Sequence, residues 1–296
     1  MATVKKNGRY LSNLHVKAYK SGVFAKLLLG INEDPELSLE VRRNDEAMVY
    51  YHKDKILTTG FNKKGKPFVK LLDEKYYKDK ESSKPSADIS NIANLKSLTL
   101  IRKYFKEAKW LVFRYKMGAE FAIQQNIALG NQTFENRFIV VDMEWQFAQS
   151  EIPEDERIPK TRIDLVVVDT EKNSRGYNDI YLTEVKCGLD ATEGTSGVKA
   201  HVENTNKIIN KHEACLALIE DVKSIISVKR ELGLIKGNYK ELIFAPKPKM
   251  MLFFAYRGEM ENEKLTQQID LAKKTAETLE MEDPLCIMHN ALITLT

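Results

Sequence analysis

Two short segments of the chain combine acidic and basic residues in a pattern that could do chemistry. Asp164 precedes an apolar run in RIDLVVVD, and Glu184 and Lys186 are two residues apart in IYLTEVKCG. Residues two apart in a β-strand project from the same face, so Glu184 and Lys186 should share one face. The segment between the two strands, TEKNSRGYND, is polar and typical of a hairpin loop. If the strands pair, Asp164 and Glu184 converge near one end.

Two buried carboxylates that lie close together repel each other unless a positive charge neutralises them. Mg²⁺ suits such a pair, because it binds a few carboxylate oxygens together with waters and substrate phosphate. A bound metal would polarise a phosphoryl group, and Lys186 could orient or deprotonate the attacking water. The three residues therefore predict metal-assisted hydrolysis of a phosphodiester. The alternative is structural: a salt bridge between Glu184 and Lys186, and a turn residue at Asp164.

In these residues the chain resembles the PD-(D/E)XK nuclease superfamily. Asp164 matches the aspartate of that motif, and Glu184-Val185-Lys186 matches the (D/E)XK element, whereas Ile163 stands where the motif has proline. The resemblance implies a restriction-endonuclease-like α/β fold and a Mg²⁺ cofactor, with Mn²⁺ as a possible substitute. It also implies metal ligands at Asp164, Glu184 and the backbone carbonyl of Val185. Relatives cleave nucleic acid or merely bind it.

Many members of the superfamily add an acidic residue from the helix before the first strand. Glu120 in MGAEFAIQQN is the candidate for this further catalytic and metal-binding residue. It shares a helix face with Gln124 and Ile127. Glu135 and Glu144 are competitors, and a solvent-exposed position for Glu120 is the structural alternative.

A substrate-binding region is expected just after the strand that carries Glu184 and Lys186. The residues GTSG, which end in Ser196 and Gly197, precede a predicted helix and could present backbone N–H groups to an anion. His201 falls on the apolar stripe of that helix, where it is either a core residue or a neighbour of the metal site. Lys199 is a candidate phosphate contact. A flexible loop with a serine N-cap is the alternative for GTSG.

The residues from 96 to 118 interleave cations with aromatic rings. Seven basic residues and one acidic residue, Glu107, fall in this stretch together with Tyr104, Phe105, Trp110, Phe113 and Tyr115. Such a segment could contact phosphates and stack on bases. The alternative is a helix that has a solvated lysine face and a core-facing aromatic stripe.

The elements that would position these residues form an α/β layer after a β-rich start. We expect a β-rich accessory domain over residues 1–85 and a nuclease-like domain over residues 86–296, with a linker between residues 78 and 90. Turns are predicted at Asn44-Asp45 and around His52-Lys53-Asp54. From residue 95 onward the periodicity predicts two helices, three strands, a long helical region over 196–232, a strand, a helix and a final strand. The sheet should be mixed and flanked by helices.

Composition narrows the class of protein further. The chain has 296 residues, a formal net charge of +4 and three widely spaced cysteines without a CxxC pair. No apolar run is long enough to cross a bilayer, and residues 1–10 have no apolar core, so we expect a cytoplasmic protein with no membrane partner. The sequence lacks GxSxG, Walker and GxGxxG motifs, which argues against serine hydrolases, P-loop ATPases and Rossmann dehydrogenases.

The combined expectation is a metal-dependent nuclease whose partner is nucleic acid, with DNA favoured. One alternative keeps the fold without the chemistry: a catalytically silent nuclease-fold protein that binds nucleic acid or assembles a complex. Another is an interaction protein in which the N-terminal domain makes the functional contacts.

Overall fold

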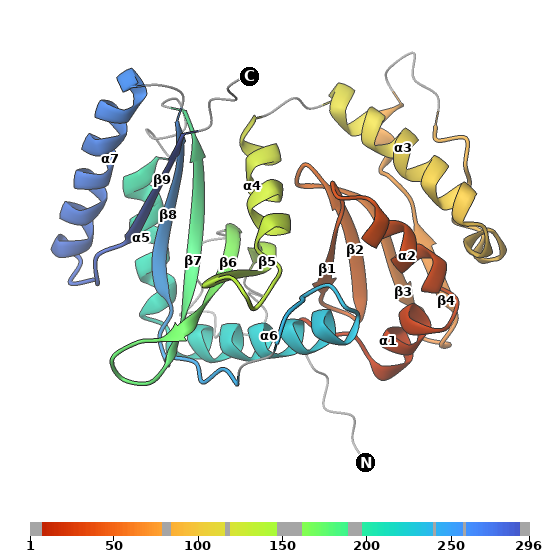
Figure 1. The fold of residues 1–296 in the computed structure, drawn as a ribbon, viewed down its shortest axis with the longest axis horizontal. Coiled ribbons are helices and arrows are strands. Elements are labelled where there is room, and N and C mark those ends of the chain that lie inside the picture. Colours follow the sequence, from red (N-terminus) through yellow and green to blue (C-terminus); the bar gives the residue numbers. More distant parts are fainter. Residues whose placement is uncertain are drawn as a thin grey trace. The chain divides into compact units, whose positions relative to one another are not determined.

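The structure is a computed structural model, and it combines α-helices with two β-sheets (Figure 1). It describes residues 8–78, 84–115, 119–146, 162–188, 197–238, 241–256 and 259–290. Two compact units divide the chain. Unit 1 consists of residues 1–133 and 220–237, and unit 2 consists of residues 134–219 and 238–296. Among the described residues, no helix is long and apolar enough to span a membrane.

Unit 1 is built around an antiparallel sheet. Its strands follow in the order β1 (Ser38–Arg42), β2 (Glu46–Tyr51), β3 (Asp54–Phe61) and β4 (Pro67–Lys70). Asn44 and Asp45 have φ values of 61° and 58°, and His52 and Lys53 have 46° and 67°. Two consecutive positive φ values are the requirement of the type I′ hairpin turn, which matches the twist of the flanking strands. Both predicted turns are therefore confirmed.

Helices also belong to unit 1, which makes its beginning less β-rich than predicted. They are α1 (Asn13–Lys20), α2 (Ala25–Glu33), α3 (Leu98–Tyr115) and α4 (Ala119–Gly130), with 3₁₀ turns at Glu74–Tyr76 and Ile92–Lys96. The hydroxyl of Ser12 accepts a hydrogen bond from His15 N and so caps α1. The first helix predicted after residue 95 is confirmed as α3, and its apolar residues Ile101, Phe105 and Val112 are buried.

The predicted boundary between residues 85 and 86 does not separate the two units, because residues on both sides of it belong to unit 1. Helix α3 packs against α2 and β3, which groups residues 86–133 with the N-terminal segment. The described part of the predicted linker is also anchored. Ala87 is 3% exposed and Ile89 is 0% exposed, so alternate residues of this segment enter the core.

Unit 2 contains a mixed sheet in the order β5-β6-β7-β8-β9. Its strands are β5 (Phe138–Gln146), β6 (Arg162–Lys172), β7 (Asn178–Cys187), β8 (Lys249–Tyr256) and β9 (Leu285–Asn290). The first three strands pair antiparallel, and β7, β8 and β9 pair parallel. Parallel neighbours need a crossover connection, and helices supply it on both occasions.

Helices α5 (Val198–Ile209) and α7 (Glu259–Thr278) pack against each other and against β8 (Figure 1). Val198 and Val202 of α5, Leu265 of α7, and Leu252 and Phe254 of β8 are completely buried in one apolar cluster. This packing fixes the face of α5 that looks toward the sheet. It thereby determines where the polar residues of the same face lie.

The helical region predicted over residues 196–232 is two helices. Helix α5 ends at Ile209, and α6 (His212–Glu231) begins after Asn210 and Lys211. The division between the two units falls inside α6, between Ile219 and Glu220. The chain thus leaves unit 2 along α6, completes unit 1 with residues 220–237, and returns to unit 2 to form β8.

Candidate active site

Asp164 lies at the point where β6 stops pairing with β7. The ladder between these strands ends at Leu165 and Thr183, although β6 continues to pair with β5 as far as Arg162. Beyond that end, Asp164 Oδ2 accepts a hydrogen bond of 3.0 Å from the backbone N of Val185. The Asp164 carboxylate thus replaces a main-chain acceptor and is held against the strand that carries Glu184 and Lys186.

Glu184, Lys186 and His201 form a compact triangle beside Asp164. Lys186 Nζ lies 2.9 Å from Glu184 Oε1 and 3.1 Å from His201 Nε2. His201 Nε2 lies 3.1 Å from the same Glu184 oxygen. A charged ammonium group can only donate, so His201 accepts through Nε2 and carries its proton on Nδ1 when Lys186 is charged.

The site is buried, and burial determines its electrostatics. Asp164, Glu184 and Lys186 are 5%, 7% and 5% exposed. Burial raises the pKa of Glu184 to about 8, and the charge of Asp164 and a hydrogen bond between the two carboxyl groups contribute to the rise. Lys186 opposes this rise through its charge and its hydrogen bond. Two buried acidic groups that raise each other's pKa in this way are also suited to share a cation.

Glu144 adds a third acidic residue to the same row of the sheet. The pairs Met143–Leu165 and Trp145–Ile163 flank it, so Glu144 stands opposite Asp164. Its φ of 57° is unusual within a strand, and a non-glycine residue in this conformation costs about 1–3 kcal/mol.

The side chain of Glu144 is paired. Its Oε2 lies 2.7 Å from Nε of Arg162, which is itself 55% exposed. The sequence named Glu144 only as a competitor of Glu120. The strand register that brings it opposite Asp164 depends on a shift between Val140 and Asp142, which no sequence signal predicts.

The other predicted site residues lie in different surroundings. Glu120 belongs to α4 in unit 1, so its metal-binding role stays a prediction. The Lys199 side chain is 64% exposed and approaches Glu203 at 3.9 Å, and its phosphate contact is likewise a prediction. Ser196 lies outside the described residues. The structure shows Val185 as a backbone donor to Asp164, whereas its carbonyl as a metal ligand stays a prediction.

The acidic residues of the candidate site are potential ligands for a divalent cation. Among the described residues, no group of three or more His, Cys, Asp or Glu side chains is arranged to hold a metal ion. The paired carboxylates of Asp164 and Glu184 nevertheless fit Mg²⁺, which completes its coordination with water, main-chain oxygen and substrate phosphate. The raised pKa of Glu184, caused by burial and by the charge of Asp164, means that added positive charge would be stabilised at this buried position.

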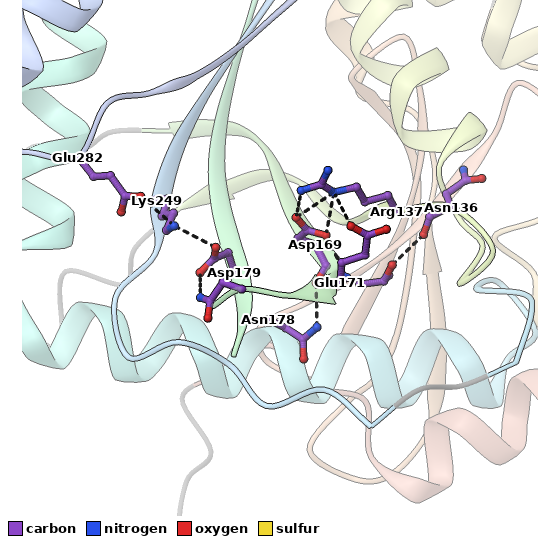
Figure 2. A network of polar contacts seen from close by, with 10 residues as sticks. Asn136, Arg137, Asp169, Glu171, Asn178, Asp179, Lys249 and Glu282 are labelled. Carbon is purple, nitrogen blue, oxygen red and sulfur yellow. Dashed lines mark hydrogen bonds and ion pairs between the residues drawn. The ribbon is translucent and has the colours of Figure 1, made fainter. Parts of the chain in front are cut away.

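A cavity of about 500 Å³ in unit 2 lies at the opposite end of β7 from this site. The hairpin between β6 and β7, the end of α5, the segment before β8 and the end of α7 line it. Figure 2 shows the polar network beside it, in which Lys249 Nζ lies 3.0 Å from Asp179 and 2.9 Å from Glu282. Both carboxylates are already engaged by the single Lys249 ammonium group, so we place the candidate chemistry at Asp164 and Glu184.

The same network fixes the far ends of β6 and β7 (Figure 2). Arg137 Nη2 lies 3.0 Å from Asp169, and Nδ2 of Asn178 donates to the backbone oxygen of Asp169. Asn178 also pairs through its backbone with Ile243. Both strands are therefore anchored at the end opposite the candidate site.

Comparison with known proteins gives no match, whether to a protein family, to a curated protein or to a solved structure.

Proposed function

We propose that this chain is a metal-dependent nuclease that hydrolyses phosphodiester bonds in nucleic acid, with DNA as the favoured substrate. The hydrogen bond from Val185 N to Asp164 carries the proposal, because it joins the aspartate to the Glu184-Val185-Lys186 strand. The order of β5, β6, β7, α5 and β8, with β7 and β8 parallel, supports the restriction-endonuclease-like fold that the resemblance implies.

In this proposal Asp164 and Glu184 hold Mg²⁺ or Mn²⁺, with the Val185 carbonyl as a further ligand. The acidic residue that completes the set is either Glu120, as the resemblance suggests, or Glu144, which stands opposite Asp164. When bound, the metal would stabilise charge on the phosphate and lower the pKa of a coordinated water.

Lys186 and His201 would act on the nucleophile. Because Lys186 Nζ contacts both Glu184 and His201 within 3.1 Å, its direction is fixed before substrate arrives. Lys186 would orient the attacking water and stabilise the developing negative charge on the phosphate oxygens. His201 is a positioning residue, since it contacts Lys186 and Glu184 through one nitrogen. The burial of Glu184 and Lys186 strengthens their electrostatic effects.

The proposal is tested with purified protein, Mg²⁺ or Mn²⁺, and single- and double-stranded DNA and RNA. We expect cleavage that EDTA abolishes and that Lys186→Ala reduces by about 100-fold or more. Lys207→Ala is the matched control, because Lys207 is an exposed lysine of α5 whose loss changes the net charge equally. Intact substrates under every condition would favour the catalytically silent alternative.

Separate variants identify the third acidic residue. If Glu144 completes the metal site, Glu144→Gln raises the Mg²⁺ concentration needed for half-maximal cleavage more than Glu120→Gln does. The reverse order assigns the role to Glu120. Calorimetric titration of Mn²⁺ into each variant measures the same difference without depending on turnover.

A further inference from the structure

One face of α3 carries two exposed aromatic rings among cations. Lys103, Lys106, Trp110 and Phe113 follow one another at intervals of three and four residues, and Arg114 lies four residues after Trp110. The five residues therefore form one stripe of the helix. The exposed fractions of Trp110 and Phe113 are 52% and 49%. Arg114 places its guanidinium carbon 4.7 Å from the centre of the Trp110 ring. This cation–π contact orders the indole at the surface.

The core of unit 1 uses other aromatic residues of the same helix. Tyr104 and Phe105 are 0% and 1% exposed, and the Tyr104 hydroxyl donates to the backbone oxygen of Ile56. The aromatic residues of α3 are therefore divided between two faces. Trp110 and Phe113 add apolar area to the surface without filling the core. Large aromatic rings grouped at the surface mark sites of interaction more often than solitary ones do.

A hollow of about 460 Å³ lies beside Trp110. Its lining consists of Lys84, Pro85, Ser86, Lys103, Lys106, Glu107, Trp110 and Leu111. Three of these residues are lysines and one is acidic. The Glu107 carboxylate accepts hydrogen bonds from Ser86 Oγ at 2.7 Å and from the backbone N of Ser86 at 2.8 Å.

Lysine charge is therefore in excess around the hollow. Lys103 approaches Glu107 only at 4.0 Å, and Lys106 has no ion-pair partner within the described part of the chain. An occupant that brings negative charge would satisfy these cations. An occupant that brings a flat ring would cover the indole.

We propose that this surface, composed of Lys84, Lys103, Lys106, Trp110, Phe113 and Arg114 and here named the α3 face, binds single-stranded DNA. Bases would stack on Trp110 and Phe113 while the lysines contact the phosphates. A duplex hides the faces of its bases inside its own stack, so it offers nothing to the indole. The choice of DNA over RNA rests on the proposed nuclease substrate, whereas binding of a single strand is independent of the active site in unit 2.

Tryptophan fluorescence can report on this face selectively. The chain has two tryptophans, and Trp145 is 1% exposed in the core of unit 2. Iodide should therefore quench Trp110 alone. We expect oligo(dT) added in EDTA to quench the same emission and to protect it from iodide. EDTA prevents cleavage, so a failed nuclease assay and a failed binding assay are distinguishable.

Variants convert this result into a test of the individual residues. Fluorescence anisotropy of labelled oligo(dT) should show that Trp110→Ala raises Kd by about five- to 150-fold, the loss of one stacked base. Trp110→Phe should retain part of the affinity. Lys106→Ala should reduce the slope of log Kd against log salt concentration by about 0.7.

Two matched controls lie elsewhere in unit 1. Lys64→Ala removes the same charge from the turn between β3 and β4, and Leu14→Ala truncates an apolar side chain of α1 that is 53% exposed. Both variants should bind like the native protein. Unchanged affinity in Trp110→Ala, equal affinity for duplex DNA, or binding of oligo(U) without oligo(dT) would each overturn the proposal. Circular dichroism confirms that the variants are folded.

Discussion

Glu184 is the residue of the candidate site that interacts with all three of its other members. It contacts Lys186 and His201, and Asp164 lies close enough to alter its ionisation. Burial is the largest cause of a pKa near 8 for this side chain, and the neighbouring aspartate adds to it. An acid that holds its proton near neutral pH in the folded state links the stability of the protein to pH.

Without metal, the free energy of unfolding should fall as the pH rises from about 5 to about 8. Between the ordinary pKa of 4.5 and the folded value of about 8, folded Glu184 binds more proton than unfolded Glu184 does. Stability falls with rising pH wherever the folded state binds more protons. Urea unfolding in EDTA across this range measures the slope, and Glu184→Gln should flatten it.

Glu203→Gln is the control for this prediction, because Glu203 is a partly exposed glutamate of α5. It should leave the slope unchanged. Addition of Mg²⁺ at pH 8 should raise the Tm of the native protein and not that of Glu184→Gln. An identical slope in Glu184→Gln would assign the pH dependence to other groups.

For individual residues, the sequence predicts which side chains lie on the same face but not which hydrogen bonds fix their positions. The alternation of a β-strand was enough to place Glu184 and Lys186 on one face, and helical spacing placed His201 on the buried face of α5. The hydrogen bond from Val185 to Asp164 depends on where the ladder between β6 and β7 ends. That end is a property of the paired strands and is not encoded in either strand alone.

Among the elements, β1 and α6 are joined by a buried ion pair within unit 1. Lys229 Nζ donates to Glu40 Oε2 at 2.8 Å, and each side chain is 1% exposed. The two residues are far apart in the sequence, and no local pattern links them. A buried charge that loses its partner is strongly destabilising, although the intact pair itself adds little.

Lys229→Met should reduce the free energy of unfolding by about 3–5 kcal/mol, because Glu40 would remain buried without its cation. Equilibrium urea unfolding measures the change. Lys223→Met removes the same charge from an exposed position of α6 and should cost no more than about 0.5 kcal/mol. The double variant Glu40→Leu with Lys229→Met should recover much of the loss. A loss as large in Lys223→Met would instead indicate a general effect on the helix.

Elements differ in how far the sequence predicted them. The strands of unit 2 and helix α3 have long, clear periodicity, and the structure contains them in the predicted order. Helices α1 and α2 have only 8 and 9 residues and were not predicted. Isolated helices of this length are marginal, and packing in unit 1 supplies most of their stability.

For the whole molecule, the main feature is that unit 1 is formed by two separate stretches of the chain. Unit 1 needs residues 220–237 as well as residues 1–133. Arg9 N donates to Asp221 at 2.7 Å, and Glu40 pairs with Lys229, so the later segment supplies partners to buried groups of the earlier one. No sequence signal predicted this exchange, because the hydrophobic pattern of α6 continues unbroken across the division.

A fragment of residues 1–133 should therefore unfold without a cooperative transition. Joining residues 220–237 to its end through a flexible Gly/Ser linker should restore a sigmoidal urea curve, since Asp221 and Lys229 then reach their partners. Circular dichroism during urea titration compares the two fragments. A cooperative transition in residues 1–133 alone would show that the later segment is dispensable.

The buried ion pair between Glu40 and Lys229 affects the order in which parts of the protein can fold during synthesis. Glu40 is translated early, whereas Lys229 leaves the ribosome only after β5, β6, β7 and α5 have been made. The core of unit 1 is therefore completed only after three strands of the unit 2 sheet have been synthesised. Domains usually fold in order from the N-terminus during synthesis. In this protein unit 1 completes its folding only after Lys229 has been synthesised.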